Sequence, residues 1–234
     1  MIKAVLFDLD NTLVDFMGMK EESVSAAVKA MIDAGLKLPL EEAKNKIFAI
    51  YKEAGIEFQE VFDRFLLEEL GGIDYKILAA GIVAYRKARE AALVLYPHVN
   101  LTLVELLKRG YLLGVLSDAP RKQAWLRLCY LNLQHLFKVV IAFEDTGVRK
   151  PHPLPFQLAL ERLNVKAEEA MMVGDWPERD MQGAANLGLT TVYARYGDTY
   201  NRLEKEVSSP VAGADYIIDD ISEIIAILEH INGL

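Results

Sequence analysis

Residues 2–12 read IKAVLFDLDNT, and their pattern indicates the fold class. Residues 2–7 form a nearly continuous apolar run, as in a strand that is buried on both faces of a parallel sheet. The run ends in residues 8–12, which are rich in turn-forming side chains. We therefore expect a buried first strand with two carboxylates, Asp8 and Asp10, directly after its carboxyl end.

Similar apolar runs recur along the chain, and helical patterns separate them. Further strands are expected at residues 111–116, 139–143, 170–173, 190–194 and 216–218. Helices are expected at residues 101–109, 121–131, 153–163, 178–187 and 221–231. Strands that alternate with helices predict an α/β fold, a doubly wound, Rossmann-like parallel sheet with helices on both faces.

One long segment interrupts this alternation. Residues 16–95 show helical spacing of apolar side chains, such as Val24, Val28 and Met31, and no convincing strand. Glycines and a proline divide the segment into about four helices. The sequence therefore predicts two domains, an α/β core over residues 1–15 and 96–234 and an inserted all-helical domain over residues 16–95.

The composition describes an acidic chain with a large core. Of its 234 residues, 52% are hydrophobic and 26% charged, which excludes a disordered or fibrous protein. The 34 acidic residues outnumber the 26 basic ones, giving a formal net charge of −8. Such a surface disfavours nucleic acid or a membrane as the main partner. Small anionic substrates are compatible with it where a metal or a local cation offsets the charge.

Cysteine usage and hydropathy suggest a location. The single cysteine, Cys129, cannot form an internal disulfide, which favours a reducing compartment. We expect this side chain to pack as a small core residue. No apolar run approaches the roughly 18 residues that a spanning helix needs. A cytoplasmic protein is the resulting prediction.

Polar side chains follow several of the predicted strands. Asp8 follows the first, Ser117 and Asp175 follow two later ones, and Lys150 stands shortly before a predicted helix. In open parallel sheets, ligands bind outside the carboxyl ends of the strands. We therefore expect Asp8, Ser117 and Asp175 to share one edge of the sheet.

The predicted edge carries several carboxylates at once. Asp8, Asp10, Asp175 and Asp180 would crowd negative charge into one partly buried cleft. Two unit charges about 4 Å apart repel by roughly 4 kcal/mol at an effective dielectric constant of 20. Protonation or a bound cation must relieve this repulsion. Oxygen ligands without neighbouring His or Cys indicate Mg²⁺, the usual partner of phosphate substrates, rather than zinc.

Taken in order, these residues resemble the four motifs of the haloacid dehalogenase superfamily of phosphohydrolases. The matching residues are Asp8-x-Asp10-x-Thr12, Ser117, Lys150 and Gly174-Asp175-x₄-Asp180. The similarity runs from residue 2 to about residue 220, and the helical insertion resembles the type 1 cap of this family. Three places depart from the common pattern. Asn11 and His98 stand where glycine is common, and Trp176-Pro177 is unusual inside the fourth motif.

The resemblance implies a catalytic role for four residues. Asp8 would be the nucleophile that forms an aspartyl-phosphate. Asp10 would protonate the leaving alcohol and then deprotonate the hydrolytic water. Ser117 would hydrogen-bond a phosphoryl oxygen, and Lys150 would neutralise charge on the phosphoryl group and on Asp8. An aspartate at position 10 favours phosphate chemistry, because a halide leaves without a proton.

The resemblance also implies a metal site and a phosphate-binding loop. Mg²⁺ would be held by Asp8, by the backbone carbonyl of Asp10 and by Asp175. Asp180 would be a further ligand or would anchor the others. Thr12 would orient the loop and Asp8, and Thr12, Ser117 and Lys150 together would hold the phosphate.

Three functions stay open at this stage. The first is a Mg²⁺-dependent phosphatase that acts on a small phosphorylated metabolite. The second is a phosphomutase of the same superfamily, which would return the phosphoryl group to a sugar hydroxyl. The third is a non-catalytic metabolite-binding module, which the intact motif set argues against. The Ile-rich last helix also leaves a homodimer open.

Residues of the inserted domain would contact the substrate. The candidates are Phe16, Met17, Met19, Lys20, Arg86 and Arg89. The three cations suit an anionic substrate, but solvated helix faces account for them as well. We expect this domain to close over the site and exclude water.

Overall fold

A parallel sheet of six strands in the order β3-β2-β1-β4-β5-β6 organises the chain around its first strand. This order is seen in a computed structural model that describes residues 1–198 and 213–233. The strands are β1 (Ala4–Phe7), β2 (Leu112–Leu116), β3 (Val139–Ile141), β4 (Ala170–Gly174), β5 (Thr190–Ala194) and β6 (Tyr216–Ile218). The prediction of a doubly wound α/β core is confirmed.

The register of the three central strands places their carboxyl ends level with one another. Phe7 of β1 lies beside Val115 of β2 on one side and beside Val173 of β4 on the other. Every residue of β1 and β4 is buried, which explains why these strands are unbroken apolar runs. The residues that follow them therefore emerge at one edge of the sheet.

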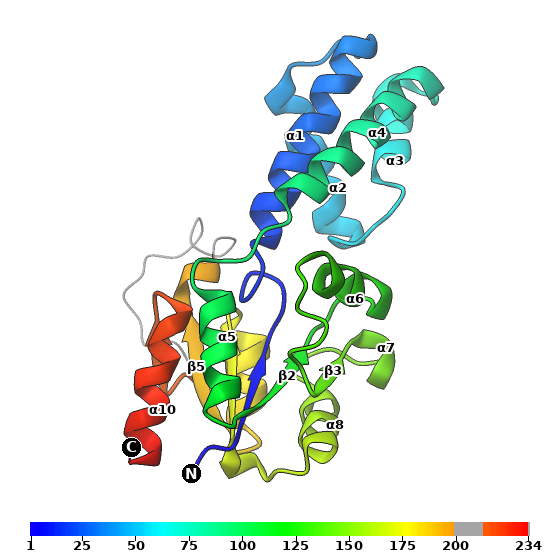
Figure 1. Cartoon of the computed structure of the whole chain (residues 1–234). Helices are drawn as coiled ribbons and strands as arrows, with labels where there is room; N and C mark the ends of the chain where they lie inside the picture. Colours follow the sequence, from blue (N-terminus) through cyan, green and yellow to red (C-terminus); the bar gives the residue numbers. More distant parts are fainter. Residues whose placement is uncertain (199–212, 234) are drawn as a thin grey trace. The chain divides into compact units, whose positions relative to one another are not determined.

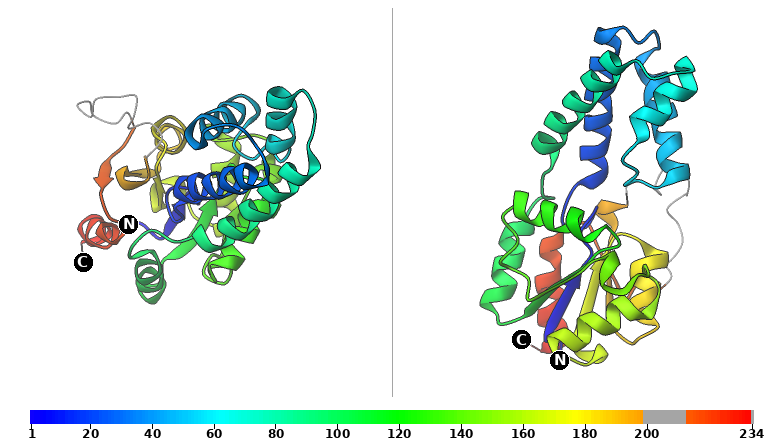
Figure 2. Two further views of the ribbon diagram at one scale, coloured as in Figure 1. Left: turned by 90° about the horizontal axis from the view of Figure 1, so that it is seen from above. Right: turned by 90° about the vertical axis from the view of Figure 1, so that its right-hand side faces the viewer.

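Helices cover both faces of this sheet, as the right-handed crossovers of a parallel sheet require (Figures 1 and 2). Their bounds are α5 (Val99–Lys108), α6 (Arg121–Tyr130), α7 (Phe143–Thr146), α8 (Pro153–Leu163), α9 (Gln182–Ala185) and α10 (Ile224–Asn232). Leu6, Met172 and Phe156 of α8 belong to one buried apolar cluster, which holds α8 and α9 against the sheet.

Residues 18–93 form a separate, all-helical unit. It contains α1 (Phe16–Ala34, from Gly18 onward), α2 (Leu40–Ala54), α3 (Val61–Leu70) and α4 (Tyr75–Ala92). The other unit comprises Met1–Met17 and Val94–Leu234. Residues 199–212 and 234 of the predicted core domain lie outside the described residues. That the helical unit acts as a cap stays a prediction.

The helical unit has a core of its own. Val24, Val28 and Met31 of α1 are fully buried against Phe65 of α3 and other apolar side chains. A Cβ on Gly81 would lie 2.1 Å from the methyl carbon and 2.9 Å from Cγ of Met31, so a larger residue at this place in α4 would displace the Met31 side chain of α1. The apolar side chains at helical spacing in α1 therefore form part of the core of the helical unit.

Two local expectations were wrong, and one expected helix is of mixed type. The strand expected at residues 139–143 ends at Ile141, because the Asp145 carboxylate accepts from the Ala142 N–H at 2.9 Å and starts the short helix α7. The helix expected at residues 178–187 begins as a π-helical turn over Pro177–Met181 before α9. Cys129 is exposed, because it lies on the outward face of α6.

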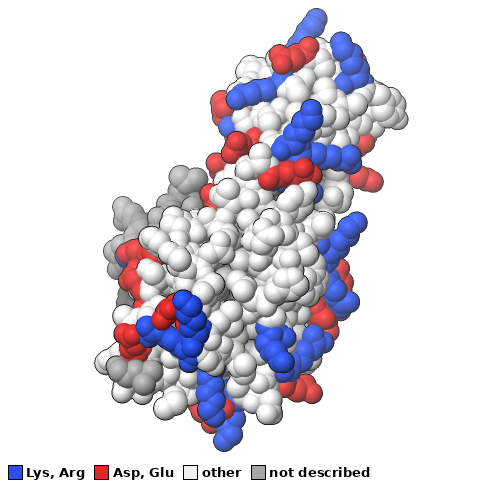
Figure 3. Space-filling view, viewed as in Figure 1, with Lys and Arg blue, Asp and Glu red and all other residues white. Residues whose placement is uncertain are grey.

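The surface carries charges of both signs. On the face shown in Figure 3, acidic and basic side chains are interspersed. Within residues 1–198 and 213–233, no helix is both long enough and apolar enough to span a membrane.

Candidate active site

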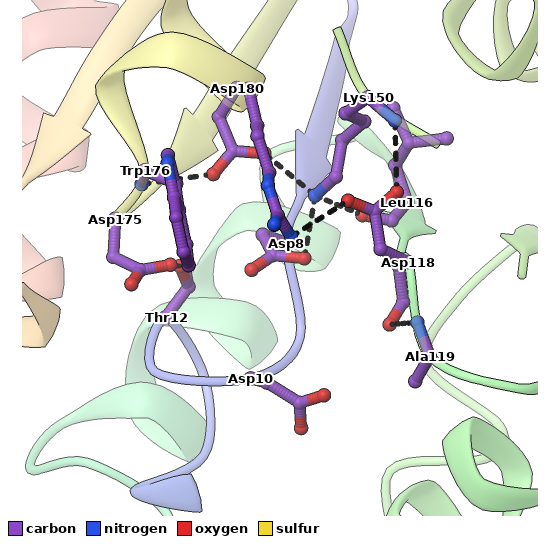
Figure 4. A network of polar contacts seen from close by, with 12 residues as sticks. Asp8, Asp10, Thr12, Leu116, Asp118, Ala119, Lys150, Asp175, Trp176 and Asp180 are labelled. Carbon is purple, nitrogen blue, oxygen red and sulfur yellow. Dashed lines mark hydrogen bonds and ion pairs between the residues drawn. The ribbon is translucent and has the colours of Figure 1, made fainter. Parts of the chain in front are cut away.

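Asp8 lies directly beyond β1, at the carboxyl edge of the sheet (Figure 4). Its backbone N–H donates to the carbonyl oxygen of Val173 at 2.9 Å, which continues the pairing of β1 with β4. The side chain is 8% exposed, and its Oδ1 accepts from the Lys150 ammonium at 2.7 Å. One carboxylate oxygen is thus engaged by a cation.

Asp175 and Asp180 join Asp8 at this edge. Oxygen atoms of the three carboxylates lie within 4.8 Å of one another, and all three side chains are buried. Asp175 follows β4, while Asp180 sits in the π-helical turn and accepts from the Trp176 N–H at 3.1 Å. A Cβ on Gly174 would lie 2.4 Å from Asp180 Oδ2, so the glycine of this motif makes room for that carboxylate.

Lys150 is the cation of the cluster. Its ammonium lies 2.7 Å from Asp8 Oδ1, 2.6 Å from Asp180 Oδ1 and 2.9 Å from the Leu116 carbonyl oxygen. Burial by itself would lower the pKa of Lys150, but the charges of Asp180, Asp8 and Asp118 outweigh burial and raise this pKa. Lys150 therefore stays charged, and its donors are aimed at the cluster.

The carboxylates resist ionisation in the absence of a further cation. Burial, together with the charges of Asp8 and Asp180, raises the pKa of Asp175 well above its usual range. Burial is also the main reason that the pKa of Asp180 rises to about 7, although Lys150 opposes it. The three carboxylates therefore carry more negative charge, when ionised, than the single ammonium of Lys150 can neutralise.

The donor set fits Mg²⁺. Asp8, Asp175 and Asp180 offer three buried carboxylates, while Lys150 compensates for one negative charge. A divalent cation among them would balance the remaining charge, and hard oxygen donors without His or Cys suit Mg²⁺. Three of the expected metal ligands, Asp8, Asp175 and Asp180, therefore lie together. The side chain of the fourth, Asp10, lies apart from them.

Asp10 lies apart from the three carboxylates, with its side chain directed away from them (Figure 4). Its Oδ2 accepts from the Arg127 Nη1 at 2.9 Å. Asn11, the next residue, has a φ of 60°, a left-handed conformation that asparagine tolerates better than most residues. The Asn11 side chain accepts from the Met17 N–H at 3.0 Å, which fixes the turn where many family members carry glycine.

The two hydroxyl residues occupy the same edge. Thr12 Oγ1 donates a hydrogen bond to Asp175 Oδ1 at 3.3 Å. Thr12 therefore contacts Asp175, although the resemblance implies that it orients Asp8. The Ser117 N–H donates to the Ile141 carbonyl at 2.9 Å, and its Oγ accepts from the Ala119 N–H at 3.2 Å. Ser117 is thereby held in the loop after β2.

The sequence assigns no role to three residues of the site. Asp118 accepts from the Lys150 N–H at 3.0 Å and so positions the backbone that carries Lys150. A Cβ on Gly197 would lie 1.6 Å from the Asn11 carbonyl oxygen, so only glycine fits beside the first loop. Arg127 stands opposite Asp10. Only the position of Asp118, next to Ser117, offered a signal.

The unusual Trp176-Pro177 pair supports the fourth motif. The Trp176 N–H bonds Asp180, and the Arg179 guanidinium lies 4.0 Å from the Trp176 ring centroid. Arg179 also reaches Asp118, 3.5 Å away. This departure from the family pattern therefore keeps Asp180 in the cluster.

Among the candidates of the helical unit, Lys20 is buried, at 5% exposure, and does not lie on a solvated face. Its ammonium lies 4.3 Å from the ring centroid of Tyr51 and 5.6 Å from that of Tyr85. Cations over aromatic faces are stabilised by the ring quadrupole. Arg86 is exposed, and Arg89 is partly so.

Comparisons with known proteins agree with this geometry. A family model described as haloacid dehalogenase-like hydrolase matches residues 2–188. Glyceraldehyde 3-phosphate phosphatase from Pyrococcus furiosus is 37% identical over 99% of this chain and 95% of its own length. The enzyme of that name from Methanocaldococcus jannaschii is 38% identical and covered to 99% in both chains. The crystal structure of a HAD phosphatase from Thermococcus onnurineus matches with a TM-score of 0.68 and 27% identity, over 97% of this chain and 98% of that one. The chain therefore belongs to the haloacid dehalogenase superfamily of phosphatases.

Proposed function

We propose that this protein is a Mg²⁺-dependent phosphatase that hydrolyses a small phosphate monoester through an aspartyl-phosphate formed on Asp8. One observation carries the proposal. The buried carboxylates of Asp8, Asp175 and Asp180 share a single ammonium, that of Lys150, at the carboxyl edge of the sheet. This arrangement suits an anionic substrate only when a divalent cation accompanies it.

Asp8 would attack the phosphorus atom in the first step. A bond forms between a carboxylate oxygen of Asp8 and phosphorus, and the bond from phosphorus to the ester oxygen breaks. The Lys150 ammonium, 2.7 Å from Asp8 Oδ1, would stabilise charge on Asp8 and on the phosphoryl oxygens. Ser117 would donate its hydroxyl hydrogen to one of those oxygens.

Asp10 would handle the protons. Its carboxyl group gives a proton to the departing alkoxide and then takes one from the water that attacks the aspartyl-phosphate. Inorganic phosphate leaves, and both aspartates return to their starting state. Asp8, the Asp10 carbonyl and Asp175 would hold Mg²⁺, with Asp180 beside them. The bound ion would supply Lewis-acid stabilisation of the phosphoryl charge.

The relatives suggest which phosphate monoester to try first. Two of them, each covered over almost its whole length, are named glyceraldehyde 3-phosphate phosphatase. We therefore propose a short phosphorylated carbon chain as the substrate class, with glyceraldehyde 3-phosphate as the first compound to assay. A phosphomutase would convert a sugar phosphate to its isomer, so release of inorganic phosphate distinguishes the two activities.

The decisive experiment measures phosphate release with Mg²⁺, with EDTA and in the Asp8→Asn variant. We expect EDTA to abolish turnover and Asp8→Asn to reduce kcat by at least about 10⁴-fold, because an amide cannot replace the nucleophile. Asp33→Asn, an exposed aspartate on α1, is the matched control and should retain full activity. Turnover that survives chelation or the Asp8 substitution contradicts the mechanism. Binding of phosphorylated metabolites without any turnover supports the non-catalytic alternative.

A further inference from the structure

A buried arginine stands behind the first motif. Arg127, in α6, is 6% exposed, and its Nη1 donates to Asp10 Oδ2 at 2.9 Å. Its guanidinium carbon lies 4.4 Å from the ring centroid of Phe16, which is itself 4% exposed. The guanidinium therefore donates to a carboxyl oxygen and lies over an aromatic ring.

Such a placement is costly unless the charge has a partner. Arginine is almost never fully buried without a partner that accepts its hydrogen bonds, because removing the charge from water is unfavourable. In this case an oxygen of the Asp10 carboxyl group accepts a hydrogen bond from the guanidinium, and Phe16 packs against the guanidinium. A guanidinium that packs against a ring donates its hydrogen bonds in a fixed direction. The flexible ammonium of a lysine at this position would supply the charge but not the direction.

The three residues lie in or shortly after two loops of the same sheet edge. Asp10 and Phe16 lie in and directly after the first motif loop, and α6 begins shortly after the loop that carries Ser117. A contact between residues 117 positions apart therefore ties the Asp10 loop to the Ser117 loop. Nothing in the chemistry assigned to Asp8, Lys150 or the metal ligands requires an arginine at this place.

We propose that Arg127 is a positioning residue that sets the orientation of the Asp10 carboxyl group for proton transfer to the leaving oxygen. The proposal rests on the proposed function, since it assigns a task only if Asp10 transfers that proton. A proton donor acts only at hydrogen-bond distance from its acceptor, so a small displacement of Asp10 removes its contribution. Arg127 does not touch the reacting atoms in this role.

The proposal predicts a dependence on the leaving group. An alkoxide is strongly basic and must receive a proton as it departs. The p-nitrophenolate ion is weakly basic and departs without one. Loss of Arg127 should therefore slow the hydrolysis of alkyl phosphates far more than that of p-nitrophenyl phosphate. A purely structural role would slow both substrates equally.

The test compares kcat on glyceraldehyde 3-phosphate, an alkyl phosphate, and on p-nitrophenyl phosphate for wild type, Arg127→Met and Arg127→Lys, with Mg²⁺ present. We expect Arg127→Met to lower the ratio of the alkyl rate to the aryl rate by about 10- to 100-fold, because proton transfer and positioning each contribute on this order. KM should change little. Arg127→Lys, which retains the charge but not the planar group, should give an intermediate ratio.

Two further variants make the result specific. Arg121→Met removes another arginine of α6, one that pairs with Asp145, and should leave the ratio unchanged. In an Asp10→Asn background, Arg127→Met should not lower the ratio further, because the group that it positions is gone.

The outcomes separate the two proposals. An unchanged ratio in a folded Arg127→Met enzyme, or a raised one, overturns the positioning role and leaves the phosphatase proposal intact. Additive losses in the double variant overturn the role as well. A wild-type enzyme that hydrolyses neither substrate overturns both proposals. Circular dichroism and thermal unfolding identify any variant that has failed to fold, and the Lys variant then decides.

Discussion

Single residues at the sheet edge set the electrostatics of the whole site. Lys150 is fixed by three oxygen atoms and stays charged, while Asp175 and Asp180 have raised pKa values. The ammonium thus neutralises only part of the charge of the cluster. A divalent cation and a phosphoryl group together would bring two positive and two negative charges, so the cation must bind for the anion to be tolerated.

Gly174, the glycine of the fourth motif, leaves space for the Asp180 side chain. In Gly174→Ala, the new Cβ would meet Asp180 Oδ2 at 2.4 Å and Asp180 Cγ at 2.5 Å, so the carboxylate must move. We expect a loss of about 1–3 kcal/mol in the free energy of unfolding, as for other overpacked sites, together with weaker Mg²⁺ affinity. Urea unfolding and calorimetric titration with Mg²⁺ measure the two effects.

Gly72→Ala is the control for this change. A Cβ on Gly72 has no neighbour within 4 Å, and that residue does not need a positive φ. Gly72→Ala should therefore change the free energy of unfolding much less than Gly174→Ala does. Equal effects of the two substitutions would show that crowding of Asp180 is not the cause.

At the scale of elements, the parallel sheet explains why the site lies where it does. β1 is flanked by β2 and β4, and the register aligns the ends of all three. The loops that carry Asp8, Ser117 and Asp175 are therefore neighbours, although more than 160 residues separate the first from the last. A parallel sheet collects its loops at one edge because every strand runs in the same direction.

The helical unit offers a test of element stability that leaves the chemistry alone. Asp74 caps α4, where its carboxylate accepts from the N–H groups of Lys76 and Ile77 at 2.9 and 3.2 Å. Asp74→Ala should lower the unfolding free energy by about 1 kcal/mol, because two donors of the first turn lose their acceptor. Chemical denaturation measures the loss, and kcat per folded molecule should not change.

Asp74→Asn is the matched control, because asparagine caps helices about as well as aspartate does. It should retain most of the stability that Asp74→Ala loses. A similar loss in both variants would assign the effect to the charge of Asp74 rather than to its hydrogen bonds.

At the scale of the whole molecule, the stability of the fold depends on pH through the buried carboxylates. In the folded chain without metal, the pKa of Asp180 is raised from 3.8 to about 7, and that of Asp175 is raised as well. The folded state then binds more protons than the unfolded state between about pH 4 and pH 7. In EDTA, the free energy of unfolding should therefore fall as the pH rises through this interval.

Mg²⁺ should reverse this trend. The ion binds ionised carboxylates, so its stabilising effect should grow with pH and reach about 2.7 kcal/mol when its concentration is about 100 times its Kd. Urea unfolding at several pH values, with EDTA or Mg²⁺, measures both effects. Asp180→Asn should flatten the dependence in EDTA. A metal-free stability that rises across the interval would contradict the charge balance described here.

Local patterns in the sequence determined the architecture of this protein and the choice of its site residues. Apolar runs determined β1 and β4, because strands buried on both faces admit few polar side chains. The order of Asp8, Ser117, Lys150 and Asp175 along these elements identified the family.

Contacts between distant segments were decided only by the tertiary structure. The pairing of Arg127 with Asp10 depends on the rotation of α6 and on the path of the first loop, neither of which a local pattern records. For the same reason the bond from Thr12 to Asp175, the exposure of Cys129 and the burial of Lys20 emerged only from the packed chain. Sequence periodicity reports which face of an element is apolar, whereas the partner that each polar side chain meets is set by how the elements pack.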